Sequence, residues 1–190
     1  MAAIPTVSRV AFLASDLVLY TQPSGPVLSS FAESYKTLSI TSSHQPSVQS
    51  IPAGGDPGVS ILRVASGASL ASFTSSITSQ IALRLVLLAT ELSSLPLVLH
   101  LAVKDDLSDI LLLQSAFPFS VVSYTPQEAH DNALLASRLA RTERRAVIHV
   151  FYELADGPVV NIAEEDVQPF LLSEKVTLSS SDMNVSDSTN

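Results

Sequence analysis

Histidine is the first side chain to consider for acid–base or metal chemistry, and this chain contains His44, His100, His130 and His149. His100 and His149 lie inside apolar runs, which favours buried, hydrogen-bonded neutral rings over a functional role. His130 lies beside Asp131 on a predicted helix and is expected at the surface, whereas His44 lies in a Ser- and Pro-rich loop. No pair has the i, i+4 spacing of a helical metal site and HExxH is absent, so no histidine metal site is expected.

An acidic cluster, Asp105, Asp106 and Asp109, follows a predicted strand that ends at Val103. Open α/β sheets bind ligands past the carboxyl ends of their strands, so a contact with a cation or a metal-bound phosphate is one interpretation. Carboxylates in the first turn of a helix are the favoured alternative, because they cap free N–H groups and complement the helix dipole. A second acidic group is interpreted as a solvated turn or another helix start: Glu164, Glu165 and Asp166.

Four arginines recur near the end of a predicted helix: Arg138, Arg141, Arg144 and Arg145. Complementation of the helix dipole explains them, and an acidic partner is the alternative. The motifs GxSxG, GxxxxGK[ST] and GxGxxG are absent, and Gly54, Gly55 and Gly58 fall in a Pro-containing loop. The residues therefore assign no catalytic, cofactor-binding or metal site to this chain.

The composition narrows the class of protein. The 190 residues carry a net charge of −8 with only 10 Lys and Arg, which argues against nucleic-acid binding. The chain has no cysteine, so it holds no disulfide, no thiolate metal site and no iron–sulfur cluster of its own. Apolar residues make up 46% and charged residues 15%, with a mean hydropathy of +0.35, which indicates surface covered by a partner or by further polypeptide. Neither a signal peptide nor a membrane span is evident, so a cytoplasmic location without membrane contact is expected.

The order of apolar runs predicts the fold. Leu97–Val103, 119–124 and 146–152 are continuously apolar and are separated by two helical patterns. This alternation is typical of βαβ units, and continuous runs are typical of strands covered on both faces. We therefore predict a three-layer α/β fold with an open, mostly parallel sheet and helices on both faces.

The remaining elements are read more coarsely. Residues 18–20 are predicted as a strand tip, 27–37 as a helix after Pro26, 59–66 as a strand or helix, and 68–74 as a strand. A long helix is expected from Ser76 or Thr78 through Leu92, and another from Thr125 to about Arg141, where Thr125, Pro126 and Glu128 form a capping box. The domain division that follows is a strand and helix part at 1–40, a mobile loop at 41–58, an α/β core at 59–172 and a disordered tail at 173–190.

The ordered set of short motifs resembles the pyrimidine-side thiamine-diphosphate domain of pyruvate:ferredoxin oxidoreductases. The similarity covers about residues 68–155. It includes a Ser-Phe-Thr stretch (Ser72–Thr74), a Ser-Gln stretch (Ser79–Gln80), a Ser-Asp turn (Ser108–Asp109) and a helix that ends with Gln114 and Phe117. It continues with a strand at 121–123, a Gln-Glu-Ala helix start (Gln127–Ala129) and a strand with His-Val-Phe (His149–Phe151). The Pro-Leu-Val opening and the short N-terminal part look most similar to the degenerate copy of this domain in the hemoprotein (beta) subunit of fungal assimilatory sulfite reductase. A related copy occurs in the flavoprotein (alpha) subunit.

One residue that this family needs for catalysis, an activating glutamate, is missing from this sequence. The family's activating glutamate lies shortly before the Ser-Phe-Thr stretch, but this chain has no Glu between Glu33 and Glu91, and the nearest acid is Asp56 in a predicted loop. The implied role is a non-catalytic, degenerate domain, or a truncated product, of a sulfite reductase subunit. Its partners would be the other domains or subunits of a multidomain oxidoreductase, or a second copy.

Cofactors follow from the same resemblance. This chain is expected to bind none, while the whole enzyme would use siroheme, an iron–sulfur cluster, flavins and NADPH. An active subunit of a thiamine-diphosphate-dependent 2-oxoacid:ferredoxin oxidoreductase is the alternative. A generic α/β module for a small phosphorylated ligand is a weaker third interpretation.

Overall fold

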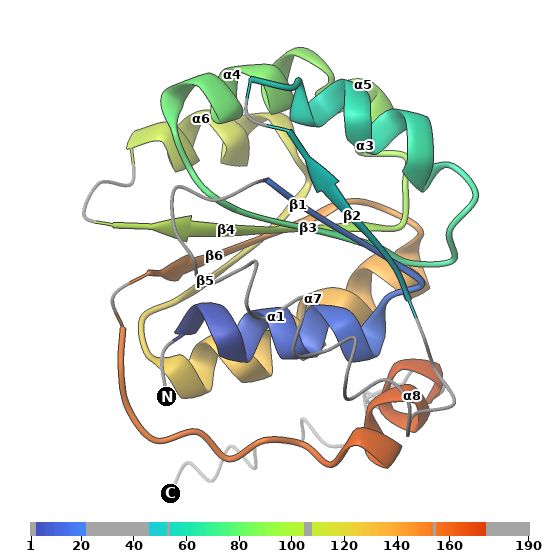
Figure 1. Cartoon of the computed structure of the whole chain (residues 1–190), viewed down its shortest axis with the longest axis vertical. Coiled ribbons are helices and arrows are strands. Elements are labelled where there is room, and N and C mark those ends of the chain that lie inside the picture. The colour runs from blue at the N-terminus through green and yellow to red at the C-terminus, as the bar shows by residue number, and fades with distance from the viewer. Residues whose placement is uncertain (1–2, 22–45, 53, 105–107, 154, 174–190) are drawn as a thin grey trace, which may run out of the picture.

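A six-stranded parallel sheet forms the centre of the molecule in the computed structural model, which describes residues 3–21, 46–52, 54–104, 108–153 and 155–173 (Figure 1). The strand order is β2-β1-β3-β4-β6-β5, and every neighbouring pair runs parallel. The strands are β1 (Leu17–Thr21), β2 (Ser47–Ile51), β3 (Ala71–Ser76), β4 (Leu97–Val103), β5 (Phe119–Ser123) and β6 (Val147–Tyr152).

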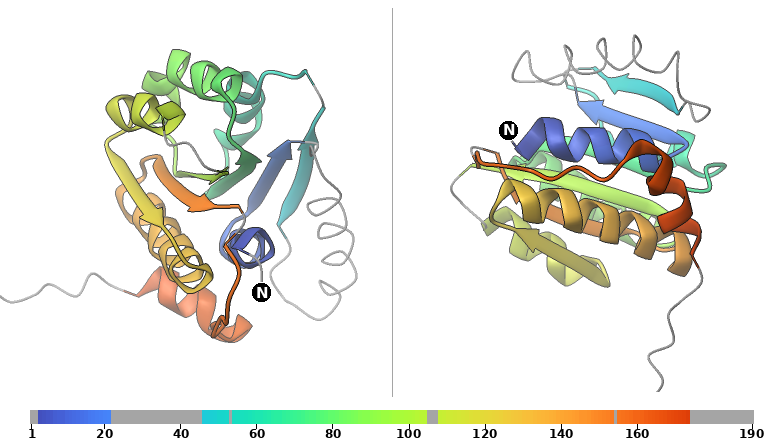
Figure 2. Two further views of the ribbon diagram at one scale, coloured as in Figure 1. Left: turned by 90° about the vertical axis from the view of Figure 1, so that its left-hand side faces the viewer. Right: turned by 90° about the horizontal axis from the view of Figure 1, so that it is seen from below.

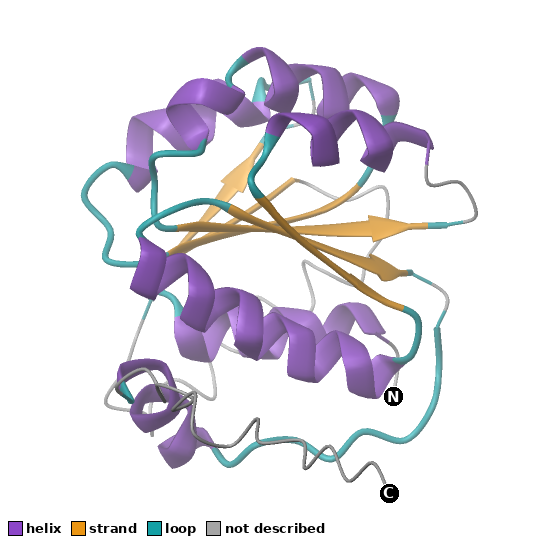
Figure 3. Cartoon of the chain, turned by 180° about the vertical axis from the view of Figure 1, so that it is seen from behind, coloured by secondary structure: helices purple, strands orange, loops and turns teal. Residues whose placement is uncertain are grey.

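Helices cover both faces of this sheet (Figures 1 and 3). One layer, which we call the upper layer, contains α3 (Pro57–Ala65), α4 (Ser79–Leu87), α5 (Ala89–Leu92) and α6 (Ser108–Ala116). The lower layer contains α1 (Ala3–Ala14) and α7 (Pro126–Glu143), with α8 (Glu164–Leu172) packed against both. The end-on view separates the layers clearly (Figure 2). The predicted three-layer α/β fold with helices on both faces is confirmed.

Strand β4 shows why its sequence is apolar throughout. All seven of its residues are buried. Because side chains alternate along a strand, Leu97, Leu99 and Leu101 pack into the upper core. Val98 and Ala102 pack into the lower core, and the same alternation turns His100 toward the lower layer. A strand buried on both faces needs apolar residues at consecutive positions, as the sequence predicted.

The helix starts follow local rules. The predicted capping box is confirmed: Thr125 Oγ1 accepts the Glu128 N–H, and the Glu128 carboxylate accepts the Thr125 N–H. Thr78 caps α4. The predicted single helix through Leu92 is wrong, because Leu88 leaves the helical region at φ −115 and ψ 18 and separates α4 from α5.

The predicted loop at 41–58 needs correction where the structure describes it, because β2 and the start of α3 lie there. Strand β2 is at the edge of the sheet and buries only Ile51, so its sequence carries little apolar signal; pairing with β1 defines it. Helix α1 was not predicted either, although most of it is buried. The helix expected at 27–37 and the tail from 174 onward lie outside the described residues.

Candidate functional site

A pocket of about 230 Å³ opens at the carboxyl ends of β1, β2 and β3. Its described wall consists of the last residues of β1 and β3, Pro52, residues 54–56, the start of α3, and the first two turns of α4. In the sheet, β1 pairs with β2 on one side and with β3 on the other. The chain goes from β1 to β2 on one side and then crosses to the opposite side of β1 to form β3, so the strand order reverses at β1. Open α/β sheets bind their ligands at such a reversal.

The hydroxyl groups in this pocket bond to one another. Ser75 Oγ donates to the Ser76 carbonyl at 3.0 Å, so Thr21 Oγ1, 2.8 Å from Ser75 Oγ, is the donor of that second bond. Ser76 Oγ donates to the Glu153 carboxylate at 3.3 Å. A nucleophilic hydroxyl needs a base as its hydrogen-bond partner. Thr21 and Ser75 have none among these contacts, whereas Ser76 has the Glu153 carboxylate. Thr21 and Ser75 can therefore bind a polar ligand but are not arranged for nucleophilic attack.

Asp56 lies in the pocket wall, although the sequence placed it in a loop. It is the N-cap of α3: its Oδ1 accepts the Val59 N–H at 3.1 Å, while its Oδ2 lies 3.2 Å from the Arg84 guanidinium. Gly58 keeps α3 and α4 close together here, because an added Cβ would lie 2.8 Å from a Leu88 methyl carbon and 3.1 Å from the Arg84 carbonyl. The sequence signal for this site was Asp-Pro-Gly before an apolar run, which marks a helix start.

The described lining provides one carboxylate, Asp56, and one guanidinium, Arg84, and these two groups already form an ion pair. Thiamine diphosphate, the cofactor that the sequence resemblance implies, would need further positive charge or a bound cation to balance its diphosphate. The described part of the chain contains no cluster of three His, Asp or Glu residues suited to a metal ion. The described lining therefore offers no unpaired positive charge for the diphosphate of this cofactor.

His100 and His149 form a second polar cluster, buried under the lower layer. Their Nδ1 atoms lie 3.0 Å apart, His149 Nε2 lies 2.9 Å from Ser123 Oγ, and Asn132 donates to the same Ser123 oxygen. The ring tautomers set the direction of these bonds, and one arrangement that satisfies all three runs from Asn132 to Ser123, from Ser123 to His149, and from His149 to His100.

Burial keeps both rings neutral. It lowers the pKa of His149 to about 3. It also lowers the pKa of His100 well below its usual value, and the nearby His149 adds to that effect. The prediction of buried, hydrogen-bonded neutral histidines is confirmed for this pair.

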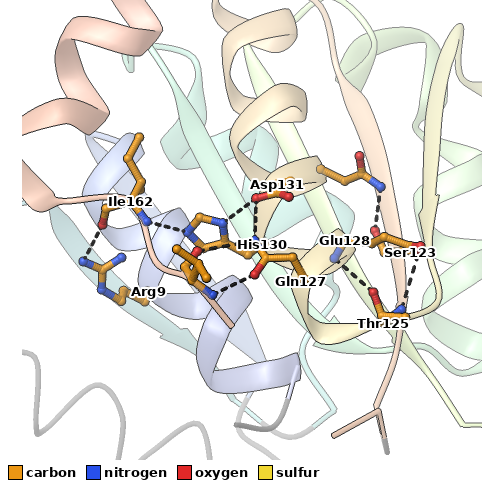
Figure 4. A network of polar contacts seen from close by, with 10 residues as sticks. Arg9, Ser123, Thr125, Gln127, Glu128, His130, Asp131 and Ile162 are labelled. Carbon is orange, nitrogen blue, oxygen red and sulfur yellow. Dashed lines mark hydrogen bonds and ion pairs between the residues drawn. The ribbon is translucent and has the colours of Figure 1, made fainter. Parts of the chain in front are cut away.

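The prediction that His130 lies at the surface is wrong, since only 2% of its side chain is exposed. Its Nδ1 lies 2.8 Å from Asp131 Oδ1, and its Nε2 accepts the Ile162 N–H at 3.2 Å (Figure 4). Ile162 is 32 residues further along the chain, and no local pattern indicated that this segment returns across α7. His44 lies outside the described residues.

Several of the other charged candidates have structural partners. Asp109 lies in the first turn of α6 and accepts from Ser79 Oγ at 3.2 Å, as the helix-start interpretation predicted; Asp105 and Asp106 are not described. Arg138 lies over the Phe170 ring and Arg141 bonds to Gln168, so both hold α8. The remaining charged candidates lie at helix ends. Arg144 caps the C-terminal end of α7 in a left-handed conformation, and the first turn of α8 contains Glu164, Glu165 and Asp166.

Comparison with solved structures agrees with the fold. The chain is similar to a 2-oxoglutarate:ferredoxin oxidoreductase from Magnetococcus marinus, with a TM-score of 0.62 and 15% sequence identity over 87% of this chain. The match covers 32% of that protein's chain, so this chain corresponds to about a third of its length. No protein-family model and no curated protein matches the sequence. The fold is therefore that of a domain found in a 2-oxoacid:ferredoxin oxidoreductase. Among the described helices, none is both long and apolar enough to span a bilayer.

Proposed function

We propose that this chain is a non-catalytic, degenerate ferredoxin-oxidoreductase-like domain that serves in the assembly of an assimilatory sulfite reductase. The sequence resemblance supports the sulfite reductase assignment, and the structural similarity supports descent from an oxidoreductase domain. In this role the chain contributes contact surface, while sulfite is reduced to sulfide at cofactors held elsewhere in the enzyme.

The observation that carries the assembly role is the outer surface of the upper layer. Leu83 and Leu87 on α4 are 51% and 65% exposed, and Leu111 and Leu112 on α6 are 66% and 45% exposed. Helices α4 and α6 are packed against each other, so these four leucines lie on neighbouring elements. Large apolar side chains that are exposed on neighbouring helices are typical of a contact with another protein. We call these four residues the leucine surface.

The state of the pocket supports a role without catalysis. A carboxylate that activates a cofactor must have an oxygen available for hydrogen bonding to it. In Asp56 one oxygen caps α3 and the other faces Arg84. These contacts maintain the start of the helix and the spacing of α3 and α4.

The assembly role is tested by binding to the hemoprotein and flavoprotein subunits of a fungal sulfite reductase, with the full chain immobilised. Leu83→Glu together with Leu87→Glu should weaken binding about tenfold or more, because charges would be buried at the contact. Leu135→Glu with a second exposed lower-layer change, Leu172→Glu, is the matched control, since Leu135 and Leu172 are 49% and 63% exposed away from α4 and α6. Undiminished binding of the α4 variant, or no binding by the wild-type chain, would overturn the proposal.

The alternative is an active subunit of a thiamine-diphosphate-dependent 2-oxoacid:ferredoxin oxidoreductase. The position of the pocket at the β1 switch point, with Asp56 in its wall, favours this alternative. Calorimetric titration with thiamine diphosphate and magnesium separates the two functions. The proposed function predicts no saturable heat at micromolar concentrations, whereas a magnesium-dependent isotherm that Asp56→Asn abolishes would show cofactor binding at this pocket and favour the alternative.

A further inference from the structure

A segment near the C-terminus crosses the outside of the lower layer. Residues 157–172, which we call the strap, run past α7 and α1 and end in α8 (Figure 1). Val160 forms two hydrogen bonds with the Gln127 side chain, one from its N–H at 2.7 Å and one to its carbonyl at 3.3 Å. At the far end, Val167 and Leu171 are buried in the lower core. Between these points the strap is held by polar contacts to Ile162.

The contact between Ile162 and His130 requires one particular protonation state of the His130 ring. The Ile162 N–H is a donor, so His130 Nε2 must carry a lone pair. His130 Nδ1 faces the Asp131 carboxylate, which is an acceptor, so Nδ1 carries the proton. The contact therefore exists only with a neutral His130 in the Nδ1–H tautomer. Protonation adds a hydrogen at Nε2 and places two N–H groups against each other.

The charged groups around His130 come from three elements. Asp131, on α7 with His130, faces the ring at Nδ1. Arg9, on α1, donates to the Ile162 carbonyl at 3.1 Å. Glu164, on α8, lies 3.8 Å from Arg9 and partly neutralises it. Asp131 can keep its bond to a protonated ring, so the contact that protonation removes is the one to the strap.

We propose that His130 is a pH-sensitive latch and that acid releases the strap from α7. A histidine ring can take up a proton at its unprotonated nitrogen, here Nε2, which is the atom that accepts the Ile162 N–H. Loss of the His130 contact leaves the strap held by the Gln127 contacts, by Arg9 at the Ile162 carbonyl and by the contacts of α8 with α1 and α7. The strap then opens more often, and the outer side of the α1–α7 pair becomes accessible to a partner.

The test is hydrogen exchange of the full chain between pH 7.5 and 5.5, expressed as protection factors so that intrinsic exchange rates cancel. Protection of the amides of residues 160–163 should fall about tenfold on acidification, the order expected for one lost hydrogen bond. Amides of β4 serve as the internal reference for global unfolding. The fall should follow the titration of the His130 ring, measured by NMR in the same sample.

Two variants separate the latch from general loosening. His130→Gln keeps an acceptor for Ile162 but cannot titrate, so its protection should not change with pH. Gln127→Ala should lower protection by a similar factor at both pH values while the pH dependence persists. The proposal is overturned if wild-type protection at 160–163 is independent of pH, if its change does not follow the His130 titration, or if His130→Gln shows the same dependence.

Discussion

The two faces of the sheet are covered in different ways. On the upper face a single layer of helices packs on the strands, and the leucine surface remains exposed outside it. On the lower face the chain returns and lays the strap over α1 and α7, fastened by Gln127, His130 and Arg9. The leucine surface is therefore exposed in the structure itself, whereas the part of α1 and α7 that lies under the strap would become accessible, under the latch proposal, when the strap opens.

The largest effect is expected from the core of the upper layer. Leu85→Ala removes a fully buried α4 side chain and should lower the free energy of unfolding by about 2–5 kcal/mol. Leu171→Ala, in the strap, is the counterpart on the lower face and should cost less, because the strap can detach without unfolding the sheet. Urea denaturation measures both. Equal losses would mean that the strap is as integral to the fold as α4.

An intermediate effect is expected from acid. Folding lowers the pKa of His149 from its usual 6.5 to about 3, so the unfolded state binds the proton more readily. The contribution of His149 to the free energy of unfolding is therefore fully present above pH 6.5. It is lost as the pH falls from 6.5 toward 3, by about 1.4 kcal/mol for each pH unit. Urea midpoints measured between pH 7 and 4 test this slope. His149→Gln should reduce it, whereas an unchanged slope would assign the acid sensitivity to other groups.

The smallest effect on stability is expected at the leucine surface. Leu83→Lys and Leu87→Lys should change the free energy of unfolding by less than about 0.5 kcal/mol, because both side chains are already largely exposed. We expect the wild-type chain to self-associate at tens of micromolar and the variant carrying these two changes to do so less, as measured by light scattering. Leu135→Lys is the control on the lower layer. A wild-type chain that scatters as a clean monomer would show that a second copy does not use this surface.

The parts of the fold that could be predicted from sequence are those determined by local patterns. Strand β4 is buried on both faces and is therefore apolar at every position except His100, so its first and last residues could be predicted from the sequence. The helix starts at Thr78 and Thr125 were readable because a side-chain cap needs a defined residue at a defined spacing. Strand β2 was missed because an edge strand with one buried residue is recognisable only through its pairing with β1.

The candidate site was less predictable because its members are distant in sequence. Asp56 and Arg84 are 28 positions apart and belong to different helices, so neither suggests the other. The same holds for His130, which was expected at a surface and is buried by Ile162. Chemistry that depends on such contacts needs the fold first, whereas the buried pair His100 and His149 was predictable, because each lies within its own apolar strand.

The closure of the lower layer has a consequence for synthesis. Gln168 donates to the carbonyl of Leu13, 155 positions earlier, and Arg9 bonds to Ile162 across 153 positions. On the ribosome, strands β3 and β4, with α4 and α5 between them, can pair as soon as they emerge, because they are consecutive strands in the chain. Helix α1 must wait for α7 and then for α8 before its outer side is covered. Contacts of such long sequence separation form slowly, so the last step of folding brings the first helix and the last described helix together.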